Sequence, residues 1–408
     1  MTARDAPHNV IFITVDAWRA DFTGSFEGVP LVPALDRLAP MTARFDRVWS
    51  NAPWTTPAIV SMLTGQRPER HGAHYAWSTP PQGGPSVAQA LGAAGWRCPN
   101  LVYLNRLDNY ANLGYRAEDA PDYPKNPEDP SLIEAIRHHG SSKHPYFLWF
   151  HYKWVHLPYW ADAESQAALG VDEGALPERV RASVGSQFVV PRGQFSLEPG
   201  DRPDVVRMYA ACVRRMGVWL DGVLEAVQAS PSRERTCVVL SADHGDELLE
   251  HGHVGHASTA HHGTLFEEVL RIPLIVIDPR VEGFRRVDTP AQGLDLHATL
   301  LSLAGCPAEA PGESLDLSPA IFGDPKALEG RGARIFSFHS ARAGYLTPRE
   351  QEGQVIRGLT DGRHKIIEER YEERRLALYD LALDPQEQRP VERGALLDLW
   401  AARLDDEP

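Results

Sequence analysis

One segment of the sequence gathers histidines and carboxylates at high density. It reads Ser241-Ala-Asp-His-Gly-Asp-Glu247, and six of the chain's 17 histidines lie between positions 244 and 262. Imidazole nitrogens combined with carboxylate oxygens suit Zn or Mn better than Ca alone. A solvated loop is the alternative, but Asp243 and His244 directly follow an apolar run, and an Asp–His pair held at a strand end is a good metal clamp. The segment therefore predicts a divalent metal site.

A second segment, residues 51–65, contains a hydroxyl that could act as a nucleophile. Thr55 or Thr56 can cap a helix that begins at Pro57 and ends before Gly65. The backbone N–H groups and the dipole at such a helix start attract anions. Taken alone, the segment is better explained by a threonine that only caps the helix. Beside a divalent cation, however, the hydroxyl would ionise more readily and could attack a substrate.

The candidate ligands follow apolar runs that predict buried strands. The runs and the residues that follow them are 9–15 with Asp16, 146–150 with His151, and 236–241 with Asp243. Ligands of open α/β sheets bind beyond the carboxyl ends of the strands, so these side chains are expected at one edge. A fourth run at 272–277 and the helical periodicity between the runs predict a mostly parallel central sheet flanked by helices. The predicted helices cover residues 86–95, 206–227, 265–270 and 294–305.

The pattern changes after Gly323. Short strand-like runs, followed by a helical segment near 392–404, predict a small antiparallel sheet closed by a helix. We therefore expect a catalytic domain over residues 1–323 and a small C-terminal α+β domain over residues 324–408. Residues 162–203 are rich in Gly, Pro and charge, which predicts an irregular insertion over the sheet edge. The strand-like runs are 333–338, 354–359, 364–367 and 377–379.

Composition excludes several classes of function. The 408-residue chain has a formal net charge of -14, which disfavours binding of a nucleic acid polymer but permits a small anionic ester in a local pocket. No run reaches the roughly 18 to 20 apolar residues of a membrane span, and the start of the chain is polar. We therefore expect a cytoplasmic protein without a membrane span. The four cysteines lie far apart, so we expect free thiols that are mostly buried; the oligomeric state cannot be read from the sequence.

The order of the motifs resembles the sulfatase family, within the alkaline phosphatase superfamily. The resemblance extends over nearly the whole chain and implies the α/β fold of that family with a small C-terminal domain. The matching segments are 9–21, 53–72 with Leu63-Thr-Gly65, His151 and His156-Leu-Pro-Tyr159, 241–252, Arg271-Ile-Pro-Leu-Ile-Val276, 294–305 and Leu378-Tyr-Asp-Leu-Ala-Leu-Asp-Pro385.

The departures from the family pattern concern the chemistry. Sulfatases carry C/S-x-P-x-R at the nucleophile and oxidise the Cys or Ser to an aldehyde, whereas this chain has Thr55-Thr56-Pro57-Ala58-Ile59. A threonine could only become a ketone, so aldehyde chemistry is not expected. Ile59 removes the arginine that would stabilise the substrate anion, and Ala17 replaces the second of two neighbouring aspartates that commonly hold Ca.

The remaining residues resemble another branch of the superfamily, in which an unmodified threonine attacks phosphorus beside one or two metal ions. That resemblance implies that Asp16, Asp243 and His244 hold the metal beside Thr55. His156 together with His256 would bind phosphoryl oxygens or a second metal. His256 lies twelve residues after His244, where sulfatases usually have Lys and phosphotransferases a metal-binding His. The histidines that could replace His256 in this role are His261 and His262.

The roles of four further residues stay open. His151 leaves an apolar strand and is either a structural residue or a ligand. Asp246 and Glu247 could orient the histidines, and Tyr159 is expected to be packing or a pocket wall.

The favoured hypothesis is a metal-dependent hydrolase or transferase for phosphate mono- or diesters or phosphonates. It would use Thr55 as the nucleophile, form a phosphothreonine intermediate and need one or two divalent ions, with Zn or Mn preferred over Ca. The first alternative is a sulfatase-type sulfuric ester hydrolase. The second is a catalytically inactive homologue that binds a ligand.

Overall fold

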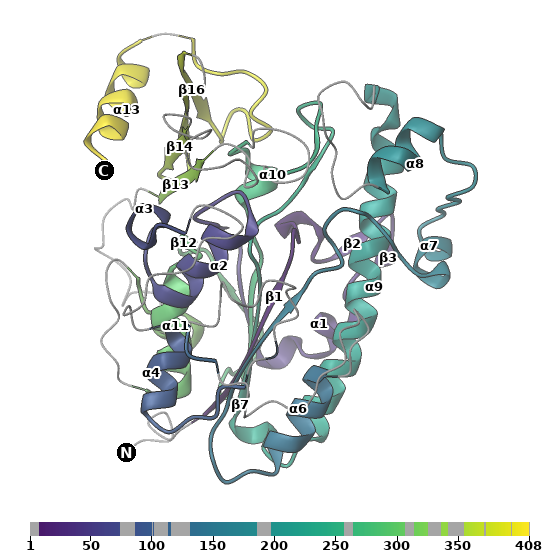
Figure 1. Ribbon diagram of the computed structural model, residues 1–408, viewed down its shortest axis with the longest axis vertical. Coiled ribbons are helices and arrows are strands. Elements are labelled where there is room, and N and C mark those ends of the chain that lie inside the picture. Colours follow the sequence, from purple (N-terminus) through teal and green to yellow (C-terminus); the bar gives the residue numbers. More distant parts are fainter. Residues whose placement is uncertain are drawn as a thin grey trace.

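The computed structural model describes residues 8–73, 86–99, 101, 113–115, 131–185, 197–256, 264–306, 314–324, 336–341, 355–370, 373–392 and 394–407. A six-stranded sheet in the order β11-β4-β10-β7-β1-β6 forms its centre (Figure 1). Its strands are β1 (Asn9–Val15), β4 (Thr42–Phe45), β6 (Phe147–Tyr152), β7 (Thr236–Ala242), β10 (Leu274–Ile277) and β11 (Arg285–Val287).

The middle of the sheet brings three predicted strands side by side. β1 runs parallel to both neighbours, with Thr14 opposite His151 of β6 and Ser241 of β7. The carboxyl ends of β1, β6 and β7 therefore share one edge, and the prediction of a mostly parallel sheet is confirmed. β10 is antiparallel to β7 and to β4, a direction that an apolar run alone does not reveal.

Helices cover both faces of the sheet (Figure 1). On one side α9 (Arg202–Ala229) packs with α1 (Pro33–Arg37), α6 (Ser131–Gly140), α7 (Ala163–Ala168) and α8 (Glu178–Val184). On the other side α2 (Thr55–Thr64), α4 (Val87–Ala93) and α11 (Asp295–Ala304) pack together. The predicted apolar stripe of α9 is buried. The expectation of an irregular insertion over residues 162–203 is wrong for α7 and α8, because Asp162 caps α7 and apolar side chains of α8 are buried.

A four-stranded antiparallel sheet follows, in the order β13-β14-β15-β16. Its own core packs Leu359, Ile366 and Leu378 against Trp400 and Leu404 of the last helix. The predicted C-terminal sheet and helix are thus confirmed, while the division of the chain near residue 323 stays a prediction. The elements are β13 (Phe336–Ala341), β14 (Val355–Thr360), β15 (His364–Arg370), β16 (Arg374–Asp380) and α13 (Ala395–Asp406).

The remaining elements are short. They are β2 (Ser25–Phe26), β3 (Val29–Pro30), β5 (Val48–Trp49), β8 (Glu247–Leu248), β9 (Val254–Gly255), β12 (Ala291–Gln292), α3 (Pro68–His71), α10 (Glu267–Leu270) and α12 (Ser318–Ile321). All four cysteines are free and buried, as predicted. Across the described ranges, none of the helices combines the length and apolarity that a membrane crossing needs.

A buried ion triad joins the C-terminal sheet to the rest of the chain. Lys365 of β15 is fully buried, and its Nζ lies 2.9 Å from Glu267 Oε1 and 2.8 Å from Glu387 Oε1. Burial alone would lower the pKa of Lys365, but the two carboxylates raise it above its usual value. Lys365 is therefore charged; it compensates Glu387, and it compensates Glu267 together with Arg271.

Replacing Lys365 by methionine should destabilise the protein by about 3 to 5 kcal/mol, because the buried Glu387 loses its cation and the half-buried Glu267 keeps only Arg271. Urea unfolding with tryptophan fluorescence measures this change. Glu387→Gln is the matched control, since burial raises the pKa of Glu387 to about 8 and Lys365 keeps Glu267. Glu387→Gln should lower the free energy of unfolding clearly less than Lys365→Met. Equal losses of stability in the two variants would contradict the proposed role of the Lys365 charge.

Candidate active site

The carboxyl ends of the three central strands bring acidic and imidazole groups together. Asp16 follows β1, Asp243 follows β7, and His151 lies inside β6. All three are buried, and their ligand atoms lie within 4.8 Å of one another. The backbone N–H of Asp16 donates to the Tyr152 carbonyl at 2.8 Å, which fixes the turn that follows β1. The structure therefore places Asp16 and Asp243 together, as predicted, and adds His151 to them.

Four donor atoms are spaced as metal ligands would be. His244 Nε2 lies 3.4 Å from Thr55 Oγ1, 3.5 Å from Asp16 Oδ1 and 3.3 Å from Asp243 Oδ2. Tetrahedral N and O ligands at the usual zinc distances are separated by about 3.4 Å. The distances from His244 to Thr55, Asp16 and Asp243 thus fit ligands of one divalent ion.

Unsatisfied polar atoms at this point support the same interpretation. Asp16 Oδ1, Asp243 Oδ2 and His151 Nε2 are buried and have no hydrogen-bond partner. The other Asp243 oxygen is satisfied, since it accepts from the backbone N–H groups of Ala17 at 3.2 Å and His244 at 3.0 Å. Orphaned buried oxygens cost free energy unless a cation or donor meets them. The residues present therefore fit a divalent metal ion.

The pKa values of Asp16 and Asp243 are shifted in opposite directions. Burial alone would raise the pKa of Asp16, but the neighbouring imidazoles of His156, His151 and His244 hold it well below its usual range. Burial raises the pKa of Asp243, and its histidine neighbour only partly offsets this. One of the two groups thus carries its charge readily, while the other needs a cation for full ionisation.

Thr55 is the first residue of α2, which corrects the expected start at Pro57. Trp54 is the N-cap and makes no capping bond with its side chain, so neither threonine caps the helix. The Thr55 hydroxyl instead faces His244. The helix ends as predicted at Gly65, whose φ of 67° places it in the left-handed region.

The turn at His244 also needs one small residue. Gly245 donates its backbone N–H to the Val269 carbonyl at 2.7 Å, so α10 packs directly against this turn. A Cβ at this position would lie 2.1 Å from the Glu268 carbonyl oxygen. Glycine therefore allows the close approach that orients His244 and Asp246.

A second group of candidate ligands lies beside the first. The His256 ring is 4.0 Å from the His244 ring and 4.8 Å from the His156 ring, measured between centroids. His244, Asp246 and His256 offer ligand atoms that lie within 4.8 Å of one another. The structure thus brings His156 and His256 to the site, as predicted. The competing histidines, His261 and His262, lie outside the described residues.

Asp246 orients His256, as predicted. Its Oδ1 lies 2.6 Å from His256 Nδ1, and its Oδ2 accepts a hydrogen bond from Tyr159 Oη at 2.9 Å. Burial raises the pKa of Asp246 to about 8, which fits a proton shared with the imidazole over this short contact. Tyr159, expected as packing or a pocket wall, is also a hydrogen-bond donor, and Glu247 accepts from Thr264 Oγ1 at 2.5 Å; a role of Glu247 in orienting a histidine stays a prediction.

Asp246→Asn should lower kcat/KM by about 10- to 100-fold, the usual loss when an acceptor that orients a ligand is weakened. Steady-state kinetics with an aryl phosphate diester measures the effect. Tyr159→Phe removes only the second bond and should cost less than about 10-fold. A larger loss of kcat/KM in Tyr159→Phe than in Asp246→Asn would contradict the greater importance of the Asp246–His256 contact.

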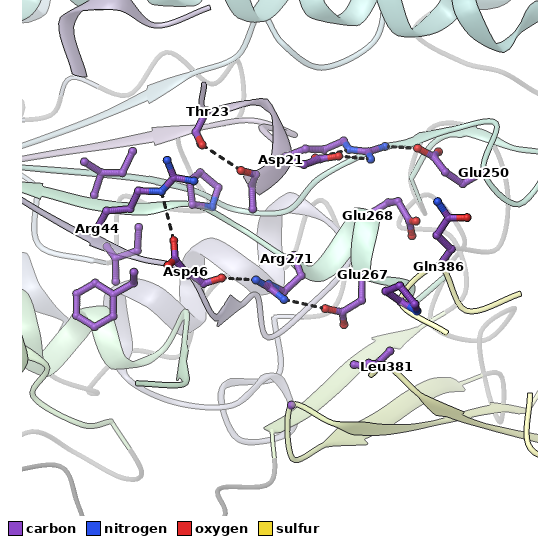
Figure 2. Close-up of a pocket in the computed structure, with 18 of the residues that line it drawn as sticks. Asp21, Thr23, Arg44, Asp46, Glu250, Glu267, Glu268, Arg271, Leu381 and Gln386 are labelled. Atoms are coloured by element: carbon purple, nitrogen blue, oxygen red, sulfur yellow. Dashed lines mark hydrogen bonds and ion pairs between the residues drawn. The ribbon is translucent and has the colours of Figure 1, made fainter. Parts of the chain in front are cut away.

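A cavity of about 780 Å³ lies elsewhere, between one sheet face and the C-terminal sheet (Figure 2). It contains none of the candidate ligands described above. Its charged walls largely pair with one another, as in the contacts of Arg271 Nη1 with Glu267 at 3.3 Å and of Arg19 Nη1 with Glu250 at 2.7 Å. The cavity is therefore a gap between the two sheets rather than part of the candidate site.

The comparison with protein families agrees with this geometry. The family model described as Sulfatase matches residues 8–306, which include every strand that positions the candidate ligands. The chain belongs to the sulfatase family. Proteins of this family bind a divalent metal ion, and this chain has clusters of candidate ligands among its described residues.

Individual relatives share part of the chain. It is 29% identical over 202 residues, 46% of its length, to a Delta 4,5-hexuronate-2-O-sulfatase of Bacteroides thetaiotaomicron. It is 27% identical over 192 residues, 44% of its length, to a sulfatase of Formosa agariphila. The matches span only 39% and 36% of those two relatives. The fold also resembles the phosphonate monoester hydrolase of Agrobacterium radiobacter, with a TM-score of 0.75 and 18% identity over 98% of this chain and 94% of that one.

Proposed function

We propose that this sulfatase-family protein is a metal-dependent hydrolase or transferase for small phosphate mono- or diesters or phosphonates. The observation that carries the proposal is the Thr55 hydroxyl, 3.4 Å from His244 Nε2 and beside buried carboxylate oxygens without hydrogen-bond partners. A threonine cannot be oxidised to the aldehyde that sulfatase chemistry needs, so its own hydroxyl is the available nucleophile. The similarity of the fold to a phosphonate monoester hydrolase is compatible with this substrate class.

In the proposed reaction, Thr55 Oγ1 attacks phosphorus in line with the leaving group. The new O–P bond forms as the bond to the leaving oxygen breaks, which leaves a phosphothreonine that water or an acceptor alcohol resolves. A divalent ion held by Asp16, Asp243 and His244 would lower the pKa of the Thr55 hydroxyl and attract the anionic ester. His156 and His256 bind the phosphoryl oxygens, and Asp246 keeps the His256 ring in place.

The donor set supports Zn or Mn over Ca. Calcium takes six to eight oxygen ligands, whereas imidazole nitrogens and few carboxylates suit transition metals. Ala17 offers no side-chain oxygen where the related pattern has a second aspartate. The group of His244, Asp246 and His256 could hold a second ion, so we propose one or two ions per chain.

Sulfuric ester hydrolysis is the second candidate, and the names of the relatives favour it. Two residues oppose it. Thr55 cannot supply the aldehyde, and Ile59 is fully buried in α2, where the family pattern has an arginine for the anion. A purely ligand-binding role has no specific observation in its favour.

The assay that tests the proposal compares leaving-group release from aryl phosphate monoesters, aryl phosphate diesters, aryl phosphonates and aryl sulfates. The protein is loaded separately with Zn, Mn and Ca. We expect the phosphorus esters to react fastest, and mass spectrometry of acid-quenched samples to find phosphate on the peptide that contains Thr55. Rapid sulfate release with Thr55 unmodified would overturn the proposal.

A further inference from the structure

His151 is fixed at one end by a chain of buried hydrogen bonds. Trp149 Nε1 donates to Thr14 Oγ1 at 3.0 Å, and the same oxygen lies 2.8 Å from His151 Nδ1. Thr14 and His151 are paired across the parallel strands β1 and β6, so the backbone register sets the contact. All three side chains are buried. The imidazole therefore has one defined orientation.

The other ring nitrogen faces the metal centre. His151 Nε2 lies 3.5 Å from Asp16 Oδ2, and its side chain is fully buried. His151 belongs to the same close group as Asp16 and Asp243, and its Nε2 has no hydrogen-bond partner. A buried ring nitrogen that lies close to two carboxylates without a hydrogen bond to either points to a missing partner.

A cation between His151 Nε2 and the carboxylates would interact favourably with both. When Nδ1 donates to Thr14, Nε2 presents a lone pair to the carboxylates, and this contact is repulsive unless a cation lies between the groups. The competing explanations are an imidazolium that neutralises Asp16, and the neutral tautomer that accepts from the Thr14 hydroxyl at Nδ1; in both, Nε2–H would donate to Asp16. In either state the Nε2–H would have to span 3.5 Å, which is long for a hydrogen bond to a carboxylate. The geometry therefore favours a ligand over a donor.

We propose that His151 Nε2 is a further protein ligand of the cation held by Asp16 and Asp243. It would supply a nitrogen from β6, while Ala17 supplies no side-chain donor. The inference rests on the metal centre of the proposed function but not on the choice between phosphorus and sulfur esters. Because Ca binds oxygen ligands, this second nitrogen beside His244 should favour Zn or Mn over Ca.

The test measures metal binding rather than turnover. His151→Leu replaces the imidazole by an apolar side chain, and Thr14→Val removes the contacts of Thr14 Oγ1 with His151 Nδ1 and Trp149 Nε1. We expect His151→Leu to weaken Zn binding in a chelator competition by more than about 100-fold and Ca binding by less than 10-fold. Thr14→Val should weaken Zn binding by only about 10- to 100-fold.

X-ray absorption at the Zn edge gives a second measurement that does not require the His151 variant to fold. His256→Leu removes a ligand of the neighbouring group, so with one equivalent of Zn it should still show two imidazole ligands, His244 and His151. One imidazole in that sample, or equal losses of Zn and Ca affinity in His151→Leu, would overturn the assignment of His151 as a ligand but not the proposed function. A wild-type protein that binds no Zn would overturn the metal centre and the proposed function as well.

Discussion

Replacing Thr55 by valine should lower kcat/KM by about 10⁴-fold or more, because no other hydroxyl would take over the attack on phosphorus. Valine has the shape and β-branching of threonine, so the first turn of α2 should be preserved. Thr55→Ser restores a hydroxyl and should keep activity within about 100-fold of the wild type. Initial rates with an aryl phosphate diester, at saturating Zn or Mn, measure both variants.

Thr56→Val is the matched control for this substitution. Thr56 is the next residue of α2 and is buried, so the same methyl-for-hydroxyl exchange tests general damage to the helix. We expect its activity to stay within a few-fold of the wild type. Substantial turnover in Thr55→Val, or an equal loss in Thr56→Val, would remove Thr55 from the mechanism. Phosphate trapped on residue 55 in the wild type and in Thr55→Ser, but not in Thr55→Val, would support it.

The sequence predicts the part of the site that follows buried strands. Asp16 and Asp243 each come directly after an apolar run, and parallel strands bring such positions to one edge. The position of His151 is harder to predict. It lies inside β6 rather than after it, and its direction depends on the register of β6 against β1. Register is a tertiary property, because a shift by one residue would turn the side chain to the other face.

Long-range contacts explain the remaining differences. Tyr159 lies 87 positions before Asp246, and no local pattern predicts that its hydroxyl reaches this carboxylate. Thr55 has the residue type of an N-cap, but α2 begins at Thr55, two residues before the predicted start at Pro57, and the Thr55 hydroxyl faces His244. β4 and β11 are only four and three residues long, and they become strands because β10 and β4 supply hydrogen-bonding edges.

Removing divalent ions with a chelator should abolish turnover and lower Tm by a few degrees. A ligand present at 100 times its Kd stabilises the folded state by about 2.7 kcal/mol, and this contribution disappears with the metal. Adding Zn or Mn back should restore both activity and Tm. Differential scanning calorimetry of chelated and reloaded protein, with activity measured on the same samples, checks the result. Full turnover in a chelated sample with no measurable metal would contradict the metal dependence.

Asp243→Asn distinguishes the effect of the metal ion on stability from the effect of the Asp243 charge. The asparagine keeps the oxygen that accepts from Ala17 and His244 and replaces the orphaned Oδ2 by a donor facing Asp16 and His244. Burial raises the pKa of Asp243, so the unfolded chain releases this proton at lower pH than the folded, metal-free protein. The contribution of Asp243 to metal-free stability therefore falls as pH rises above the ordinary carboxyl pKa of about 3.9.

Chelated Asp243→Asn should consequently melt at or above chelated wild type, and the difference should grow between pH 5 and pH 8. Adding Zn or Mn should reverse the order, because only the wild type retains the charged ligand that the ion needs. Such a reversal cannot come from a general packing defect, which would lower Tm with and without metal alike. If chelated Asp243→Asn melted well below chelated wild type at pH 8, Asp243 would be a structural hydrogen-bond acceptor rather than a buried charge that awaits a cation.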